Sequence, residues 1–338
     1  IHVEWEALPI VSDVETALAD TTLVHPECEA RSNAYDRVRI RKGDCAAAWQ
    51  AAEVVVEGRY TLPRQEHAFL QPEAALAYVD SEGLVNVEIA GQWAHEDRRQ
   101  IAHALGLPPD RVRVRYPAIG GAFGGREDVS LQIVMALAAW RLGQRGEKRR
   151  IRATWSRRES ILGHAKAHWT RIDARWGATR SGRIVAMEAR MILDSGAYNY
   201  TTDVLLRNAL TFVCGPYEVP CVHAEGVAVY TNNVPGAAFR GFGAPQACFA
   251  AEGQMNKLAA ALGMDPVALR LQNRLREGSV GITQTVVPAG VSLGEVLETC
   301  AEATGPERSR TEPPAASSFR SLPPEPRALR TGRGFACG

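Results

Sequence analysis

The sequence predicts an α+β fold of mixed sheets and helices, and three observations support this prediction. Strands and helices follow one another without a regular strand–helix–strand rhythm. Alternating segments joined by short turns at 74–90 and 171–193 are typical of antiparallel hairpins. Two loops rich in glycine and phenylalanine each precede a helix-like run. The 338 residues, 46% hydrophobic, suffice for two domains or one large one.

In the first half of the chain, valine-rich residues 53–60 predict a strand, and Gly83 marks the turn of the first hairpin. Residues 95–106 predict a helix that Gly106 ends. A strand at 111–116 then leads through the first glycine loop to a helix at 128–142. That helix is apolar on all sides, so we expect it to be buried.

In the second half, the hairpin at 171–193 is followed by the second loop and a helix ended by Gly263. Asp265 and Pro266 are typical of the N-cap and first position of another helix. The proline-rich residues 305–330 predict an exposed linker. Because the chain starts without Met and its last apolar residues resemble the start of a strand, we expect a fragment of a longer chain.

Bulk composition excludes several classes of protein. The net charge of +1 does not favour nucleic acid as a partner, and no apolar run reaches the roughly 18–20 residues of a membrane helix. The seven cysteines include no C-x-x-C pair, which argues against an iron–sulfur cluster, a zinc ribbon or a disulfide scaffold. We expect reduced cysteines and therefore a cytoplasmic protein.

The first glycine loop, "GGAFGGRE" at 120–127, matches neither common nucleotide-binding pattern. A P-loop requires Lys and then Ser or Thr where Arg126 and Glu127 stand. The spacing of the dinucleotide fingerprint is also absent. The alternative to ligand binding is a structural role, in which a tight turn of glycines packs the strand against the helix.

The second loop is "AFRGFGAPQ" at 238–246, and its Arg240 and three histidines elsewhere in the chain have competing interpretations. Arg240 lies between two phenylalanines before a helix, where it could bind an anion or form a surface salt bridge. His164 and His168 lack the glutamate of a zinc-protease motif, so we expect a polar structural segment. For His67 we expect a hydrogen-bonded structural role rather than a catalytic base.

Four motifs in order resemble the molybdenum-binding subunit of the xanthine dehydrogenase / aldehyde oxidase family. They are "QEHAFLQPEAALA", "GGAFGGRE", "LDSGAYNYT" and "GAAFRGFGAPQ". The family usually has G-G-G-F-G-G-K-E as the glycine motif, so Ala122 and Arg126 are departures. The resemblance implies three segments: the end of an α/β hammerhead-type domain and a linker at 1–45, the first molybdenum cofactor-binding domain at 46–278, and a linker with the truncated start of the second at 279–338.

The resemblance also implies which residues hold the molybdenum-pyranopterin cofactor. Gln92 matches the glutamine that hydrogen-bonds an oxo ligand of molybdenum, with no direct protein ligand to the metal. The first loop would approach the pterin through its backbone, and the second loop would complete the site. These loop residues are Gly121, Phe123, Gly124, Ala238, Phe239 and Arg240.

Three side chains match substrate-binding residues of the family. Phe242 matches an aromatic that packs on a flat ring, while Glu127 and Arg207 match a pair that brackets a purine. With Gln92, this pair would be catalytic: Arg207 would stabilise ring charge and Glu127 would hold or relay a proton. We therefore expect a purine hydroxylase acting on xanthine or hypoxanthine. The alternatives are an aldehyde or other N-heterocycle oxidoreductase, an inactive partner-binding chain, or a helix-capping Glu127 and a surface Arg207.

The resemblance further implies partners. The family passes electrons through 2Fe–2S clusters to FAD, which we expect on partner subunits or missing segments, in a dimer of heterotrimers. The cofactor would carry a cytosine dinucleotide tail. The family's catalytic base is a glutamate beyond the end of this chain, so we expect the fragment alone to be inactive.

Overall fold

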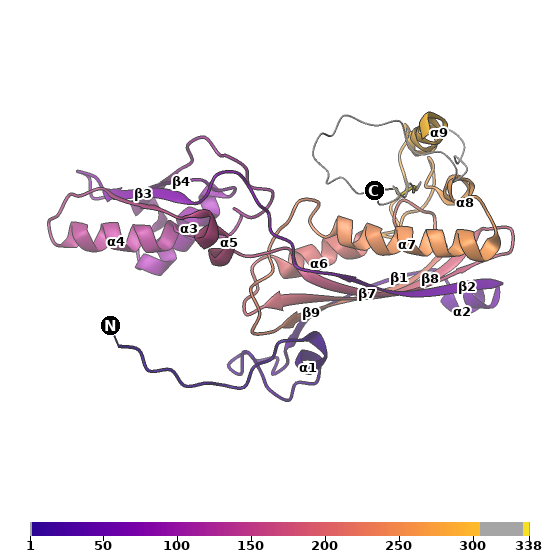
Figure 1. The fold of residues 1–338 in the computed structure, drawn as a ribbon, viewed down its shortest axis with the longest axis horizontal. Coiled ribbons are helices and arrows are strands. Elements are labelled where there is room, and N and C mark those ends of the chain that lie inside the picture. Colours follow the sequence, from indigo (N-terminus) through magenta and orange to yellow (C-terminus); the bar gives the residue numbers. More distant parts are fainter. Residues whose placement is uncertain (1, 305–333, 338) are drawn as a thin grey trace, which may run out of the picture.

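The computed structural model describes residues 2–304 and 334–337 and contains two mixed sheets (Figure 1). The larger sheet has five strands in the order β1-β9-β8-β7-β2, and only β8 and β9 pair in parallel. These strands are β1 (Ala34–Lys42), β2 (Val54–Leu62), β7 (Trp169–Ala178), β8 (Ile184–Gly196) and β9 (Cys221–Tyr230). The α+β prediction is confirmed.

The smaller sheet is formed by the chain between β2 and β7 and makes the left-hand lobe of Figure 1. Its order is β5-β4-β3-β6, where β4 and β5 pair in parallel. Its strands are β3 (Ala74–Val79), β4 (Val85–Ile89), β5 (Val112–Arg115) and β6 (Ile151–Thr154). Helices α3 (Ala94–Leu105) and α4 (Gln132–Gln144) share its hydrophobic core.

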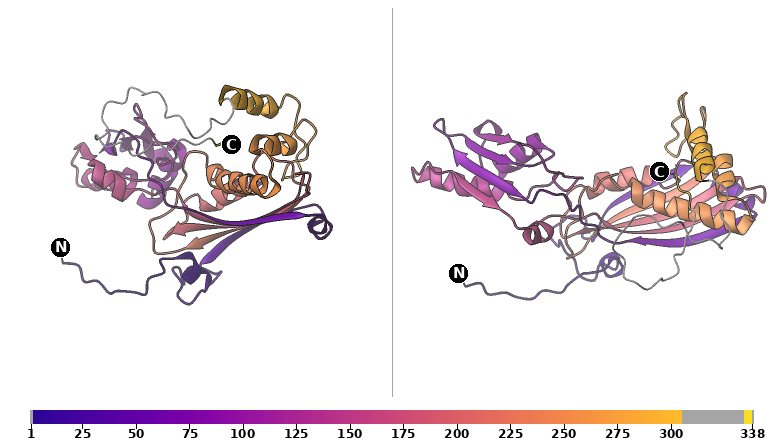
Figure 2. Two further views of the ribbon diagram at one scale, coloured as in Figure 1. Left: turned by 45° about the vertical axis from the view of Figure 1, so that its right-hand side comes forward. Right: turned by 45° about the horizontal axis from the view of Figure 1, so that its top comes forward.

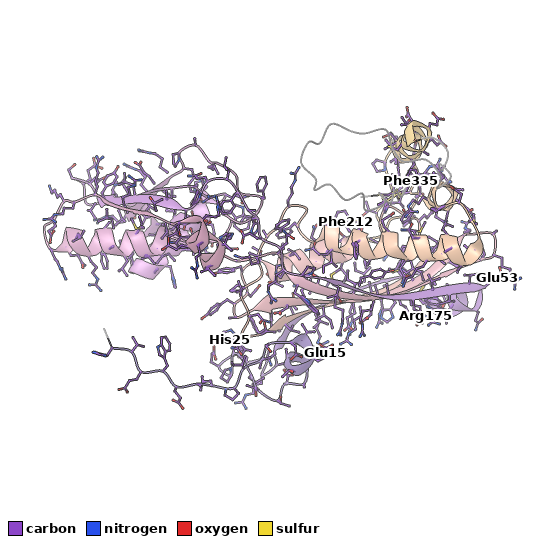
Figure 3. All side chains as sticks on the ribbon, viewed as in Figure 1. Glu15, His25, Glu53, Arg175, Phe212 and Phe335 are labelled. Atoms are coloured by element: carbon purple, nitrogen blue, oxygen red, sulfur yellow. A yellow bond between two sulfur atoms is a disulfide. The ribbon has the colours of Figure 1, made fainter. Side chains whose placement is uncertain are left out.

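Helices α6 (Thr202–Thr211) and α7 (Ala244–Leu262) cover one face of the larger sheet, and α8 (Pro266–Asn273) and α9 (Leu293–Thr304) lie beyond them (Figure 2). Trp176 is fully buried in the core that they share. On the opposite face, alternating charges pair across strands, as in Arg39–Glu225 at 3.2 Å. Figure 3 places Phe212 on the helix side of the sheet and Arg175 on the charged side. The shorter helices are α1 (Val14–Leu18), α2 (Cys45–Gln50), α5 (Arg157–Gly163) and a 3-10 turn at Pro109–Arg111.

The local signals for turns and caps are confirmed. Gly83 adopts a φ of +80° between β3 and β4, and β7 and β8 form the second hairpin. Gly106 and Gly263 end α3 and α7 in the left-handed conformation that glycine adopts without a Cβ penalty. Asp265 caps α8 by accepting hydrogen bonds from two backbone N–H groups, which stabilises a helix by about 1 kcal/mol.

Three predictions about helices and strands are wrong. Helix α4 begins at Gln132 rather than 128, because residues 128–131 form bends after the glycine loop. It is also not buried on all sides: Val134 is 63% exposed and Leu137 41% exposed, since only one face contacts the small sheet. Residues 334–337 form no strand, although Cys337 packs into the larger core. The linker predicted at 305–330 lies outside the described residues.

The expectation of reduced cysteines is wrong for one pair. Cys45 and Cys221 form a disulfide with a Cα–Cα distance of 5.3 Å. Lys42 pairs with Val222, and at Gly43 the backbone approaches Pro220 closely, so the end of β1 brings the two cysteines together. A separation of 176 residues leaves no local sequence signal for this bond. The cytoplasmic prediction therefore loses the observation on which it was based.

The segment predicted at 1–45 contributes a strand to the larger sheet, because β1 pairs with β9 over Ala34–Lys42. The domain boundary at residue 46 stays a prediction. Val11 and Val14 pack against Ile192 and Val229 beneath the same sheet. Among the described residues, none of the helices combines the length and apolar content needed to cross a bilayer.

Candidate functional site

The two glycine-rich loops meet at one pocket of about 360 Å³, which we call the inner pocket. The backbone N–H of Arg240 donates to the carbonyl of Phe123 at 3.0 Å and joins the loops directly. Of the predicted cofactor residues, only Gly121 does not line this pocket. The lining residues are Gln92, Phe123, Gly124, Glu127, Ala238, Phe239, Arg240, Gly241 and Phe242.

Close backbone approach explains the glycine at position 124. Its φ is +95°, and a Cβ built there would lie 2.6 Å from the carbonyl oxygen of Ala238. Phe123 and Phe242 also adopt positive φ values, 53° and 44°, which is uncommon for residues with a side chain. Such conformations persist where the surroundings enforce them and cluster at ligand sites. Gly121 supports the loop from behind, packed against Phe69.

The side-chain amide of Gln92 has a defined orientation. Its Oε1 accepts hydrogen bonds from the backbone N–H groups of Gly124 at 3.0 Å and Arg126 at 3.2 Å. Two donors facing one atom identify that atom as the oxygen. The Nε2 group is then the donor left for a ligand, and no protein acceptor among the described residues takes it. This arrangement fits a group with an exposed oxygen, such as the oxo ligand of a molybdenum cofactor.

Arg126 is a structural residue rather than a phosphate-binding one. Its side chain is buried and donates to the carbonyls of Gly121 and Gln71, at 3.0 and 2.5 Å. The guanidinium stacks 4.1 Å from the ring centre of Phe69. The carboxylate of Glu73, 3.9 Å away and also buried, balances its charge. These contacts use the planar fork of arginine, which a lysine lacks.

A buried polar cluster supports the second loop from the other side. His67 hydrogen-bonds the carbonyl oxygen of Ala238 at 2.7 Å, and burial lowers the pKa of its imidazole. Ligand atoms of Glu66, His67 and His164 lie within 4.8 Å of one another, a spacing that a metal ion could bridge. However, the ammonium of Lys166 already lies 3.0 Å from Glu66 and supplies a positive charge there. We therefore assign this cluster a structural role.

His168 is likewise structural. It hydrogen-bonds Thr202 at 2.7 Å, and burial lowers its pKa to about 4. Together with His67, it agrees with the expectation of hydrogen-bonded structure in this segment. Gly236 passes close over its ring, where a Cβ would lie 2.3 Å away.

Arg240 gives the inner pocket a cationic side. Its side chain is exposed, and within residues 2–304 and 334–337 it forms no ion pair. The alternative interpretation, an arginine in a surface salt bridge, is therefore wrong for the described chain. An arginine without an ion-pair partner at a pocket suits an anionic ligand.

Glu127 lines both the inner pocket and a neighbouring pocket of about 570 Å³. Burial raises the pKa of its carboxyl group. Burial also raises the pKa of Asp128 to about 7, with a further contribution from the charges of Glu127 and Asp97. Glu127 does not act as a plain helix cap, because α4 begins five residues later.

Arg207 does not lie opposite Glu127, so the predicted Glu–Arg pair is not brought together. Its guanidinium lies 3.1 Å from Asp36 and 3.8 Å from Asp203 on the exposed side of α6, and it lines neither pocket. Asn208 faces the site instead and donates to the carbonyl of Phe242 at 2.6 Å. Helical spacing could have identified it, since Asn208 shares a face with the buried Leu205.

Sequence reasoning also missed the lining of the neighbouring pocket. Aromatic side chains from the start of α3 and from the loop before α6 surround it, next to Asp128. These residues include Trp93, Tyr198 and Tyr200. The loop motif "LDSGAYNYT" resembles a family block, but nothing in it indicates where its tyrosines lie.

Comparison with known proteins agrees with this geometry. A family described as the molybdopterin cofactor-binding domain matches residues 24–274. The nicotinate dehydrogenase large molybdopterin subunit of Eubacterium barkeri is 36% identical over 302 residues, which covers 89% of this chain and 69% of that protein. The xanthine dehydrogenase molybdenum-binding subunit of Escherichia coli is 30% identical over 284 residues, which covers 82% of this chain but only 36% of that protein.

Solved structures give the same result. The aldehyde oxidoreductase of Desulfovibrio gigas superimposes with a TM-score of 0.82 at 30% identity, over 87% of this chain and 32% of that one. Quinoline 2-oxidoreductase of Pseudomonas putida also has a TM-score of 0.82, at 25% identity over 90% of this chain and 39% of that one. With two loops that fit the cofactor and a family match over most of its length, the chain belongs to the molybdopterin cofactor-binding subunits of the xanthine dehydrogenase family.

Proposed function

We propose that this chain binds a molybdenum-pyranopterin cofactor between its two loops and contributes to hydroxylation of an N-heteroaromatic ring. The observation that carries the proposal is Glu127, a half-buried carboxyl with a raised pKa that lines both pockets. A protonated carboxyl can donate a hydrogen bond to a ring nitrogen, a group that aldehydes lack. When bound, the cofactor supplies the transfer of water-derived oxygen to carbon and accepts two electrons.

The residues of this chain bind and orient. Gln92 offers its Nε2 donor to the cofactor, and Arg240 offers a cation to an anionic part of it. Phe242 lines the inner pocket, and its ring would fix the plane of a flat substrate. Glu127 holds a proton at the substrate's ring nitrogen, which stabilises negative charge as it develops in the ring.

A purine such as xanthine or hypoxanthine is the substrate we propose to test first. The similarity to a protein named as a xanthine dehydrogenase subunit supports this choice. The similarity to a nicotinate dehydrogenase subunit supports the wider class of N-heteroaromatic rings. Of the Glu–Arg pair that favoured a purine, only Glu127 lines the pocket, so the carboxyl alone carries the argument.

We also propose the partners that the family resemblance implies: 2Fe–2S and FAD subunits in a dimer of heterotrimers, with a cytosine dinucleotide form of the cofactor. The chain spans 36% and 30% of two of the relatives it matches, so activity is proposed for a complete subunit within such a complex. The catalytic base would come from outside this chain.

Glu127→Ala tests the function directly. In the complete enzyme we expect kcat/KM for hypoxanthine to fall about a hundredfold, the lower range for loss of a proton-transferring group. Turnover of an aromatic aldehyde should change only a few-fold, because its carbonyl carbon carries no ring nitrogen. Equal losses with both substrates would contradict the proposal.

Glu127→Gln tests the protonation state. Because burial raises its pKa, wild-type Glu127 stays protonated to higher pH, and kcat/KM should fall only as pH rises through that raised pKa. Glutamine cannot titrate, so this basic limb should disappear from the pH profile. A limb that stays at the same pH in the variant would assign it to another group.

The variants Arg207→Met and Asn208→Ala test which of these two adjacent residues contributes to the site. Arg207 pairs with Asp36 outside both pockets, so we expect kcat/KM to remain within twofold of wild type. Asn208 holds the carbonyl of Phe242, and loss of that hydrogen bond, about 1 kcal/mol, should raise KM several-fold. Steady-state kinetics on both variants would show the reverse order if Arg207 contacts the substrate.

A further inference from the structure

The neighbouring pocket of about 570 Å³, which shares Glu127 with the inner pocket, combines aromatic and acidic side chains, and we call it the outer pocket. It lies between the start of α3, the first glycine loop and the segment that leads into α6. Its aromatic side chains are largely accessible: Trp93 is 48% exposed, Tyr198 61% and Tyr200 40%. The full lining is Trp93, Glu96, Gln100, Glu127, Asp128, Tyr198, Asn199, Tyr200 and Thr201. Accessible aromatic faces around a cavity suit a flat ring.

The charge of the outer pocket is negative and largely unbalanced. Glu96 is neutralised by Arg99 at 2.5 Å. Glu127 and Asp128 form no ion pair within the described part of the chain, and Oδ2 of Asp128 is buried without a hydrogen-bond partner. Behind them, Oδ2 of Asp97 accepts hydrogen bonds from Tyr116 and Gln132, while its Oδ1 is buried without a hydrogen-bond partner in the described part of the chain. No Lys or Arg belongs to the described lining.

The two pockets therefore have opposite electrostatic character on the two sides of Glu127. Arg240 lines the inner pocket and forms no ion pair within the described residues, which suits an anionic cofactor. The outer pocket contains the carboxylate of Asp128, which repels an anion and attracts a cation, and aromatic faces, which also attract a cation. A substrate that reaches the inner pocket through the outer one passes the carboxylate of Asp128.

We propose that the outer pocket receives the substrate ring and selects neutral or cationic N-heteroaromatic rings over rings that carry a carboxylate, with Asp128 as the residue that determines this selectivity. The inference rests on the proposed function, because it assigns the ring of that substrate to this pocket. It distinguishes the chain from a nicotinate-oxidising enzyme, whose substrate is an anion, despite the similarity to a nicotinate dehydrogenase subunit.

Three probes with one ring test the charge preference: nicotinate, nicotinamide and 1-methylnicotinamide, with charges of −1, 0 and +1. Their dissociation constants are measured on the complete enzyme at pH 8.5, by quenching of tryptophan fluorescence. Trp93→Phe shows which part of the quenching reports the outer pocket. We expect nicotinate to bind about tenfold more weakly than nicotinamide, because its carboxylate is repelled by one protein carboxylate at close range in a partly solvated site. 1-Methylnicotinamide should bind most tightly.

Asp128→Asn keeps the side-chain shape and removes its charge, so the ratio between nicotinate and nicotinamide should shrink towards one. Glu188→Gln removes a carboxylate from the charged face of the larger sheet and should leave the ratio unchanged. Tyr200→Leu should weaken all three probes, and 1-methylnicotinamide most, because the tyrosine face also attracts a cation. Tighter binding of nicotinate than of nicotinamide, or an unchanged ratio in folded Asp128→Asn, would overturn the proposal.

Binding and turnover separate this inference from the proposed function. If the charge order holds but none of the ring substrates is hydroxylated, the proposed function fails and the selectivity of the pocket stands. If rings are hydroxylated but nicotinate is the preferred ring, the selectivity fails and the hydroxylase function stands.

Discussion

Gly124→Ala is expected to remove most of the molybdenum from the purified enzyme. A Cβ at this position would lie 2.6 Å from the carbonyl oxygen of Ala238, closer than real contacts allow, and that atom is rigid backbone. The two loops must then move apart, and Gln92 loses the N–H group that orients its amide. The metal content, measured by mass spectrometry, should fall several-fold, and activity should fall with it.

A matched control separates this steric effect from backbone strain. Gly146 also has a positive φ, +77°, but nothing lies within 4 Å of a Cβ built there. Gly146→Ala should therefore lose about 1 kcal/mol of stability through left-handed strain alone, with full metal content. Equal molybdenum content in the two variants would show that the loops do not enclose the cofactor.

The sequence predicted local structure well where a residue type enforces a backbone conformation. Gly83, Gly106 and Gly263 end or turn their elements because their φ values are positive. Asp265 capped a helix as expected. These signals are short-range, so a single stretch of sequence contains all the information that they need.

Predictions failed where the answer depended on contacts distant in sequence. Arg207 and Asn208 are adjacent, and only the pairing of Asp36 on β1 with α6 shows which side chain turns away from the site. The apolar pattern of the sequence alone could not show that Val134 lies on a helix face that the described residues leave exposed. The outer pocket is assembled from three separate segments, so its charge could not be read from any one of them.

The structure of the loops explains why two departures from the family motif are tolerated. Arg126 does not line the inner pocket, and its guanidinium lies in a buried cluster with Phe69 and Glu73. Position 122 is part of the turn whose carbonyl accepts from Gly125 at 2.9 Å, and a methyl group is accommodated there. The pocket-lining residues Phe123 and Gly124 keep the family pattern.

Reduction of the Cys45–Cys221 disulfide is expected to lower the stability of the fold more than most single substitutions would. The bond joins residues 176 positions apart, at the start of α2 and the start of β9. Loop-closure entropy for a loop of this length corresponds to about 5 kcal/mol in the unfolded state, an upper value because residual structure and strain reduce it. Thermal unfolding with and without dithiothreitol measures the difference.

Cysteine variants distinguish the loss of the disulfide from the loss of individual cysteine side chains. Cys45→Ser should lower the melting temperature and abolish its response to dithiothreitol. Adding Cys221→Ser should change the melting temperature little further, because the first substitution has already removed the disulfide. Cys28→Ser, at an exposed thiol, is the matched control and should melt like wild type. Additive losses from Cys45→Ser and Cys221→Ser, with a melting temperature insensitive to dithiothreitol in the wild type, would mean that the two thiols stay reduced. The pairing of β1 with β9 would then depend on the backbone ladder alone, and the expectation of a reducing compartment would regain its support.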